Sequence, residues 1–199
     1  MTGHWASDVV ACVALGLAVL LVVGWNLSVS AARLDRLHHR VESSFAALTT
    51  QLVRRAAAAL ESVTLVDPSA GLVLADAAAR AMGPWPDGGP WTEEHSEQQN
   101  DLTRALDEVF GDPAEVALVR GDQLAADSLA WLAQACARVQ IARRFHNDAV
   151  AAAQRRRRKR VVRWARLAGH APVPTMVDFD DRVPMGLQQS GTWSHGPVA

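Results

Sequence analysis

The chain has 199 residues, 49% of them hydrophobic, and a formal net charge of −1; outside one long apolar segment, about 165 residues remain for a single domain with a modest core. Its two cysteines, Cys12 and Cys136, do not suggest a disulfide scaffold, and the sequence carries no Gly-rich phosphate loop, nucleophile elbow or Cys-His cluster with metal spacing. The near-neutral charge conceals eight basic residues and no acidic one between Arg155 and Arg166, which leaves 12 basic against 21 acidic residues elsewhere.

The apolar segment is a run of 24 residues over 9–32 without a charged or His side chain. At about 1.5 Å per helical residue, about 20 residues cross the ~30 Å hydrocarbon core of a bilayer. Trp5 and Trp25 stand near its two ends, where indole side chains favour the membrane–water interface. The pattern predicts a transmembrane anchor over 9–32, preceded by a short extracytoplasmic N-terminus over 1–8.

Two alternatives to an anchor remain open. The small residues at 28–32 suit cleavage of a signal peptide, although no positively charged start precedes Asp8. A buried core helix is the other alternative, but such helices seldom stay apolar on every face over this length. Arg33, Arg36 and Arg40 follow the apolar run. Because Lys and Arg near a span stay in the cytoplasm, we expect a single-pass protein of the cell membrane with its N-terminus outside and its C-terminal domain cytoplasmic.

The first soluble helix should continue the anchor, because no helix breaker lies between residues 9 and 66. Its apolar residues follow a seven-residue repeat, which predicts a coiled-coil-like seam packed against near-parallel helices of the same chain or of a second copy. The seam contains Leu27, Ala31, Leu34, Val41, Phe45, Leu48, Leu52 and Ala59, with His38 and Arg55 at the two remaining positions.

A proline and a Gly/Pro-rich stretch delimit the second helix. Asp67-Pro68 should end the first helix, and Ser69 is expected to cap a second one that runs to Met82. The composition of 83–90 predicts a loop. The expected core residues of the second helix are Leu72, Leu74, Ala75, Ala78, Ala79 and Met82.

The third helix should begin after Thr92, with Glu93 and Glu94 at the positive end of its dipole, and should end at Phe110 before Gly111. Its expected core residues are Leu102, Ala105, Leu106, Val109 and Phe110.

Asp112-Pro113-Ala114-Glu115 predicts a helix restart, because it combines an N-cap, Pro at the first helical position and Glu at the third. The last helix is expected to be long, with an interruption near Gly121. Its expected apolar face consists of Leu132, Ala135, Val139, Ala142, Phe145, Ala149 and Ala152.

Together these elements predict an all-α protein in which the N-terminal transmembrane helix continues into an antiparallel bundle of about four long helices over 33–168. Past His170 the chain is rich in Pro, Gly and Ser without periodicity. We therefore expect 169–199 to be a largely disordered tail with an ordered rim at most, and Asp178, Asp180 and Asp181 to be solubilising.

The segment Ala142-Arg143-Arg144-Phe145-His146-Asn147-Asp148-Ala149-Val150 resembles the signature helix of the LemA family of bacterial proteins. Asn26-Leu27 after the span, Gln51-Leu52-Val53-Arg54-Arg55 and Val177-Asp178-Phe179 resemble further features of that family. His146 departs from the family's usual Tyr, and the Arg-rich stretch after the signature helix also departs from its pattern. The resemblance implies a membrane-anchored bundle of long helices without an established catalytic chemistry.

Two surfaces are candidate sites. The motif face consists of Arg143, Arg144, Phe145, Asn147 and Asp148, which is either a partner-binding face or a set of ordinary charge pairs such as Arg144–Asp148. The basic tract consists of Arg155, Arg156, Arg157, Arg158, Lys159, Arg160, Arg163 and Arg166, with Trp164 as a membrane-interface residue.

The basic tract has three interpretations. An up-down bundle returns the end of its last helix to the bilayer, where each cation near an anionic leaflet contributes about 1 kcal/mol. Sequence-independent binding of nucleic acid is the second interpretation, and a solvated helix end is the third. We expect a non-catalytic, membrane-anchored scaffold of the LemA type without metal or cofactor, whose basic tract contacts anionic lipid; the alternative is a nucleic-acid binder at the inner membrane face.

Overall fold

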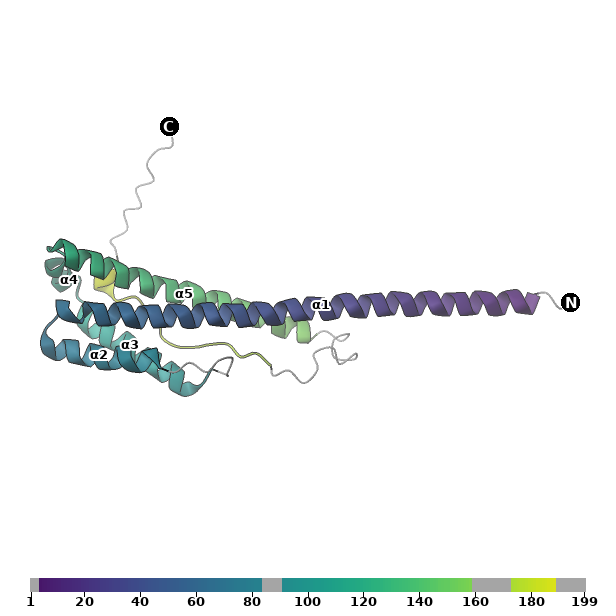
Figure 1. Ribbon diagram of the computed structural model, residues 1–199, viewed down its shortest axis with the longest axis horizontal. Helices are drawn as coiled ribbons and strands as arrows, with labels where there is room; N and C mark the ends of the chain where they lie inside the picture. The colour runs from purple at the N-terminus through teal and green to yellow at the C-terminus, as the bar shows by residue number, and fades with distance from the viewer. Residues whose placement is uncertain (1–3, 84–90, 159–172, 189–199) are drawn as a thin grey trace, which may run out of the picture. The chain divides into compact units, whose positions relative to one another are not determined.

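The computed structural model describes residues 4–83, 91–158 and 173–188, and its regular elements are all helical (Figure 1). The all-α prediction is therefore confirmed for the described residues. The helices are α1 (His4–Glu61), α2 (Pro68–Met82), α3 (Glu93–Phe110), α4 (Pro113–Val119) and α5 (Gln123–Arg157), with 3₁₀ turns η1 (Ser62–Leu65) and η2 (Met185–Leu187).

The chain divides into two compact units. The first unit comprises 1–41 and 149–174, and the second comprises 42–148 and 175–199. Two of the three boundaries fall inside α1 and inside α5, so each of these helices contributes to both units. The apolar segment belongs to the first unit, and the helical bundle to the second.

Among the described residues, no helix has the length and apolarity needed to cross a membrane. The transmembrane part of the predicted architecture consequently has no support from the helices, whereas the helical bundle is confirmed. The side chains described from Val13 to Trp25 are nevertheless exposed, with Leu21 at 72% and Trp25 at 76%.

The seam expected along the first helix is confirmed where side chains are described. Leu48, Leu52 and Ala59 are fully buried, and Phe45 is half-buried. Arg55 also lies in the seam and is only 1% exposed. The side chains of Leu27, Ala31 and Leu34 lie outside the described residues.

The second helix begins and packs differently from the prediction. Asp67, and not Ser69, is the N-cap: its carboxylate accepts a hydrogen bond from the Ser69 backbone N–H at 2.9 Å, and the Ser69 hydroxyl donates to it as well. These hydrogen bonds lower the pKa of Asp67. Leu72 and Ala79 are exposed, and the buried residues are Gly71, Leu74, Ala77, Ala78 and Ala81.

Small residues let α2 approach its neighbours closely. A Cβ atom on Gly71 would stand 3.1 Å from both a methyl group and the carbonyl oxygen of Val63 in η1. Packing against η1 and α3 therefore decides which face of α2 is buried. Most of the buried positions are shifted by one residue from the face that the Leu spacing suggested.

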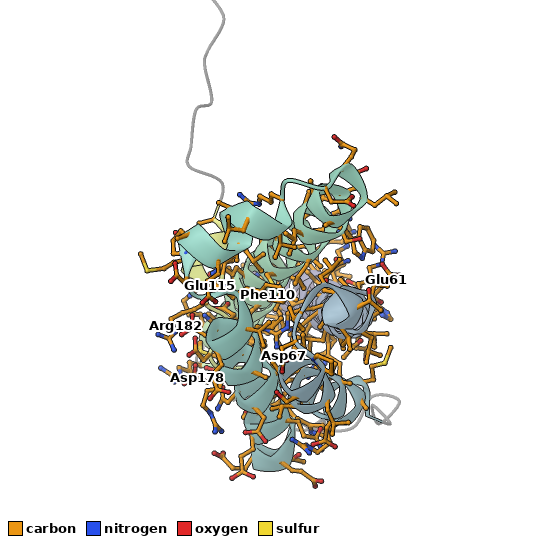
Figure 2. The ribbon with its side chains drawn as sticks, turned by 90° about the vertical axis from the view of Figure 1, so that its left-hand side faces the viewer. Glu61, Asp67, Phe110, Glu115, Asp178 and Arg182 are labelled. Atoms are coloured by element: carbon orange, nitrogen blue, oxygen red, sulfur yellow. The ribbon has the colours of Figure 1, made fainter. Side chains whose placement is uncertain are left out.

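The predicted starts of α3 and α4 are confirmed. Thr92 caps α3, and the His95 side chain accepts from the Thr92 backbone N–H at 3.1 Å, which closes a capping box with His in the third position. Asp112 caps α4 through the Ala114 N–H at 2.7 Å. Phe110, at the end of α3, is 1% exposed and points into the centre of the second unit (Figure 2).

The long helix α5 starts at Gln123, after the interruption expected near Gly121. Its predicted apolar face is correct at Leu132, Ala135 and Val139 but wrong at Phe145, which is 63% exposed. His146 takes the inward position and is 3% exposed. Its Nδ1 lies 3.1 Å from the Ser44 hydroxyl, and its ring packs on Phe45 with the centroids 5.5 Å apart.

Neighbouring substitutions on α5 should therefore differ sharply. We expect Phe145→Ala to change the free energy of unfolding by less than about 0.5 kcal/mol, because most of its side chain is in solvent. His146→Ala should cost about 1–3 kcal/mol, since it removes a buried ring and leaves the Ser44 hydroxyl without that bond. Urea denaturation followed by circular dichroism measures both; equal effects would contradict this burial pattern.

Candidate functional site

The candidate site of the second unit is the place where residues 175–188, here called the strap, pack on the helical bundle. Val177, Phe179 and Leu187 of the strap are buried, and the strap ends in the 3₁₀ turn η2. The prediction of a largely disordered tail is wrong over 175–188. The physical reason is that the strap's backbone obtains hydrogen bonds from bundle side chains in place of a regular secondary structure.

Three polar side chains on one face of α3 bind the strap. The Ser96 hydroxyl donates to the Asp178 carbonyl at 2.8 Å, and the Thr103 hydroxyl donates to the Asp180 carbonyl at 2.6 Å. Between them, Asn100 Oδ1 accepts from the Asp180 backbone N–H at 2.7 Å. Their spacing of four and three residues keeps all three on the same side of the helix.

A matching polar stripe on α5 binds the strap through Gln140, Arg143 and Asn147. Asn147 exchanges two hydrogen bonds with Val177: its Nδ2 donates to the carbonyl, and its Oδ1 accepts from the backbone N–H, both at 2.9 Å. Gln140 Nε2 donates to the Asp181 carbonyl at 2.9 Å. Arg143 binds the Asp181 carboxylate through Nε at 2.7 Å and Nη2 at 3.1 Å, a bidentate pair that is mostly shielded from solvent.

The Phe179 ring is the apolar centre of this site. It stacks on Trp91 with the ring centroids 5.6 Å apart and is 6% exposed. The guanidinium groups of Arg143 and Arg55 lie over the same ring, 5.6 and 5.9 Å from its centroid. Val177 and Phe179 form a hydrophobic cluster with Leu48, Leu52 and Val139, so the strap completes part of the core.

Arg55 is the least expected member of the core, because a fully buried arginine usually has a carboxylate partner. Its Nη2 donates to Gln99 Oε1 at 2.6 Å, its Nη1 donates to the Thr103 hydroxyl at 3.2 Å, and its Nε has no hydrogen-bond partner. Gln99 Nε2 in turn donates to the Ala81 carbonyl at the end of α2. One buried network thus joins α1, α2 and α3 and reaches the strap through Thr103.

Burial changes the titration of two groups in this region. Desolvation lowers the pKa of Arg55, opposed by the nearby Cys136, Asp181 and Asp180. Desolvation raises the pKa of the buried Cys136 thiol, and the positive charge of Arg55 opposes that rise. The Cys136 thiol is therefore held in its neutral form.

The motif face predicted around Arg144 is divided by the structure. Arg143 and Asn147 point to the strap, whereas Arg144, Phe145 and Asp148 are exposed. Within the described residues, Arg144 and Asp148 form no ion pair; Arg143 instead pairs with Asp181 and, at 3.6 Å, with Asp178. Asp181, expected to be solubilising, is thus a structural contact.

Only the start of the basic tract lies within the described residues. Arg155 and Arg158 are exposed and Arg156 is half-buried. The Arg157 side chain, together with Lys159, Arg160, Arg163, Trp164 and Arg166, lies outside the described residues, as does the Trp5 side chain.

A shallow, open groove of about 660 Å³ runs between α3 and the strap. It is lined by Ser96, Asn100, Phe179 and charged side chains of both signs, among them Asp178 and Arg182 at the surface in Figure 2. The Ser96 hydroxyl accepts from the Trp91 indole at 2.8 Å and donates to the strap, so it is committed to structural bonds. No group of His, Cys, Asp and Glu side chains suited to a metal ion occurs in the described part of the chain.

The sequence analysis named two of the strap-binding side chains, Arg143 and Asn147, without their role, and missed Ser96, Asn100, Thr103 and Gln140. The signal that could have found them is the pair of polar stripes at helical spacing, Ser96, Asn100 and Thr103 on α3 and Gln140, Arg143 and Asn147 on α5. In the sequence alone, such polar stripes have the pattern of solvent-exposed helix faces, because nothing in it shows that the strap covers them.

The chain matches no protein-family model, no curated protein and no solved structure. The resemblance to the LemA family stays a prediction from its short motifs.

Proposed function

We propose that this protein is a membrane-anchored helical scaffold of the LemA type, which presents an interaction domain at the cytoplasmic face of the membrane without catalysing a reaction. The observation that carries the proposal is the exposed apolar surface at the start of α1. Val13, Leu15, Leu17, Val19, Leu20, Leu21, Val22, Val23 and Trp25 are all between 43% and 76% exposed. A continuous apolar surface on every side of one helix requires a non-aqueous environment or a partner.

The length of the apolar run favours a bilayer as that environment. The described exposed side chains over 13–25 correspond to about 20 Å of helix, and the full run over 9–32 to about 36 Å, at about 1.5 Å per residue. The longer value exceeds the ~30 Å hydrocarbon core and allows for tilt. A retained anchor accounts for this surface better than a cleaved signal peptide, because the same helix continues into the bundle as α1.

A charge in the middle of the run should prevent membrane retention. We expect Leu20→Arg to move the tagged full-length protein from the alkaline-washed membrane pellet to the soluble or aggregated fraction, because a central Arg costs about 2.5–3.5 kcal/mol of insertion. Leu72→Arg on α2 is the matched control, since Leu72 and Leu20 are 72% and 69% exposed. Equal retention of both variants would contradict an anchor over 9–32.

The same membranes test the orientation. A C-terminal tag that resists protease in intact spheroplasts and is digested after lysis places the bundle in the cytoplasm, as Arg33, Arg36 and Arg40 predict. Digestion in intact spheroplasts would reverse the orientation and direct the basic tract towards polymers of the cell envelope.

The basic tract is proposed to make a second, electrostatic contact with anionic lipid. Arg155 and Arg158 are exposed at the end of α5, and four further cations follow over 159–166. We expect the end of the last helix of an up-down bundle to return to the bilayer surface, which would bring the tract close to the anchor. Cations close to an anionic leaflet contribute about 1 kcal/mol each within a Debye length.

Neutralising the tract should weaken lipid binding in a composition-dependent way. We expect the full-length Leu20→Arg protein, kept soluble in mild detergent below its lytic level, to bind vesicles with 30–40% anionic lipid (roughly a cytoplasmic leaflet) at least about tenfold better than neutral vesicles. Changing Arg155, Arg158, Lys159 and Arg160 to Gln should remove this preference; changing the exposed Arg80 and Arg104 should not. Indifference to anionic lipid would contradict the contact.

Nucleic acid is the second proposed partner of the tract. Six consecutive cations bind phosphates without reading sequence, and binding to DNA or RNA would fall steeply as salt rises. The acidic remainder of the chain opposes a long polyanion, which favours lipid.

A further inference from the structure

The bundle recognises the strap mainly through its backbone. Ser96, Thr103, Gln140 and Asn147 donate to strap carbonyls, and Asn100 and Asn147 accept from strap N–H groups. Among the described residues, the backbone–backbone bonds of the strap are confined to its end, at Leu187 and Gln188. Over 175–183 the strap is therefore bound as an extended peptide is bound, by side chains that belong to other elements.

The surface of α3 and α5 that the strap covers is here called the peptide groove, and it differs from the open groove between α3 and the strap. Side-chain selection in the peptide groove occurs at alternate positions. Val177 and Phe179 are buried and Asp181 is held by the bidentate Arg143, whereas Met176 is 51% exposed and the Asp178 side chain is 98% exposed, although it lies 3.6 Å from Arg143. Alternate selection is typical of extended peptide ligands, whose successive side chains point to opposite sides. The selected pattern is an apolar residue, an aromatic residue two positions later and an acidic residue two positions after that.

The charges of the groove favour the same ligand. Arg143 and Arg55 place two cations over the aromatic position, and Arg143 also provides a bidentate site for the carboxylate. Arg55 is fixed by Gln99 and Thr103, which belong to α3 and not to the strap. The recognition groups on α3 and α5 thus belong to helices whose backbones have their own hydrogen bonds.

We infer that the groove formed by α3 and α5 is a peptide-binding site, which takes from a partner protein an extended segment with the apolar–x–aromatic–x–acidic pattern in exchange for the protein's own strap. The inference rests on the interaction-scaffold part of the proposed function and names its contact surface. The strap of a second copy has the same chemistry, and the experiment distinguishes the two sources.

The test uses the full-length protein in mild detergent and a fluorescent peptide of residues 173–188. In the wild-type chain the strap competes from within the molecule at an effective concentration of about a millimolar or more. Phe179→Ala weakens the binding of the resident strap and leaves the groove unchanged. The Phe179→Ala protein should therefore bind the wild-type peptide at least about tenfold more tightly than the wild-type protein does, as measured by fluorescence polarisation. A peptide carrying the same Phe179→Ala change should bind at least about tenfold more weakly.

Substitutions in the groove supply the controls. Adding Asn147→Leu to the Phe179→Ala chain removes both bonds to the peptide position of Val177 and should abolish binding. Adding Arg144→Ala should not, because Arg144 is exposed and, in the described part of the chain, makes no hydrogen bond or ion pair with the strap, although it follows Arg143 directly. If Phe179→Ala fails to fold by circular dichroism, Asp181→Asn is the second variant that weakens the resident strap. It keeps the buried side chains of the strap and removes the ion pair with Arg143.

Three outcomes decide the inference. Peptide binding that follows the groove variants supports it. A light-scattering dimer of the wild-type chain that the free peptide dissociates would overturn the partner protein as the occupant and assign the site to the strap of a second copy. No binding to either folded variant with a weakened strap overturns it. Because detergent replaces the bilayer throughout, loss of membrane anchorage would leave these results unchanged, so failure of the two proposals is distinguishable.

Discussion

Replacing Arg55 by Ala is expected to destabilise the protein by about 2–5 kcal/mol, although the change removes a buried charge. The side chain is 1% exposed and fills the seam of α1, and its loss leaves Gln99 Oε1 without the donor that stands 2.6 Å away. Arg54→Ala, at the exposed neighbouring position, is the control and should stay within about 0.5 kcal/mol. Urea denaturation in detergent measures both.

A double substitution separates the charge from the packing. Arg55→Met keeps the apolar stem but leaves Gln99 unsatisfied, and Gln99→Leu leaves the buried guanidinium with fewer partners. The double variant removes both unmatched groups. Its loss of unfolding free energy should therefore be smaller than the sum of the two single losses by about 1–3 kcal/mol. Strict additivity would show that the guanidinium and the amide of Gln99 do not depend on each other.

Phe179→Ala is expected to cost about 3–5 kcal/mol if the strap remains docked, and less where the strap detaches before the bundle unfolds. The ring is 6% exposed and contacts Trp91, Arg55 and Arg143, so its removal leaves a cavity beside two cations. In either case, limited proteolysis should cut within 175–188 at least about tenfold faster than in the wild-type chain.

Met176→Ala is the matched control for this experiment, because Met176 lies in the same strap and is 51% exposed. It should change neither the free energy of unfolding by more than about 0.5 kcal/mol nor the rate of cleavage. Unchanged cleavage of the Phe179→Ala strap would mean that the hydrogen bonds from α3 and α5 hold the strap without its aromatic anchor.

The helices and their ends followed closely from local sequence signals. Asp67-Pro68, Thr92, Gly111 and Asp112-Pro113 act through the backbone of their own neighbourhood, so no knowledge of distant residues is needed to interpret them. The choice of Ser69 as a cap was wrong by two residues, because the carboxylate of Asp67 reaches the same backbone donors.

Helix faces were predicted well where large apolar residues dominate and poorly where small and polar residues do. The seam of α1 through Leu48 and Leu52 was correct, since large aliphatic side chains leave water wherever they can. On α5 the alternation of Phe145 and His146 is decided by a hydrogen bond and a ring contact from α1, which lies about a hundred residues away in sequence. Hydrophobicity alone ranks Phe above His and selects the wrong side chain.

The sequence by itself determined that the chain is helical, where its helices begin and end, and that one apolar and one basic segment need an explanation. Only the tertiary structure decided that Arg55 is a core residue and that 175–188 is a docked strap. The physical reason is that both depend on polar side chains finding partners far along the chain: Gln99 and Thr103 for Arg55, and the stripes on α3 and α5 for the strap. Until those partners are placed, the sequence does not distinguish a polar side chain that is buried from one that is solvated.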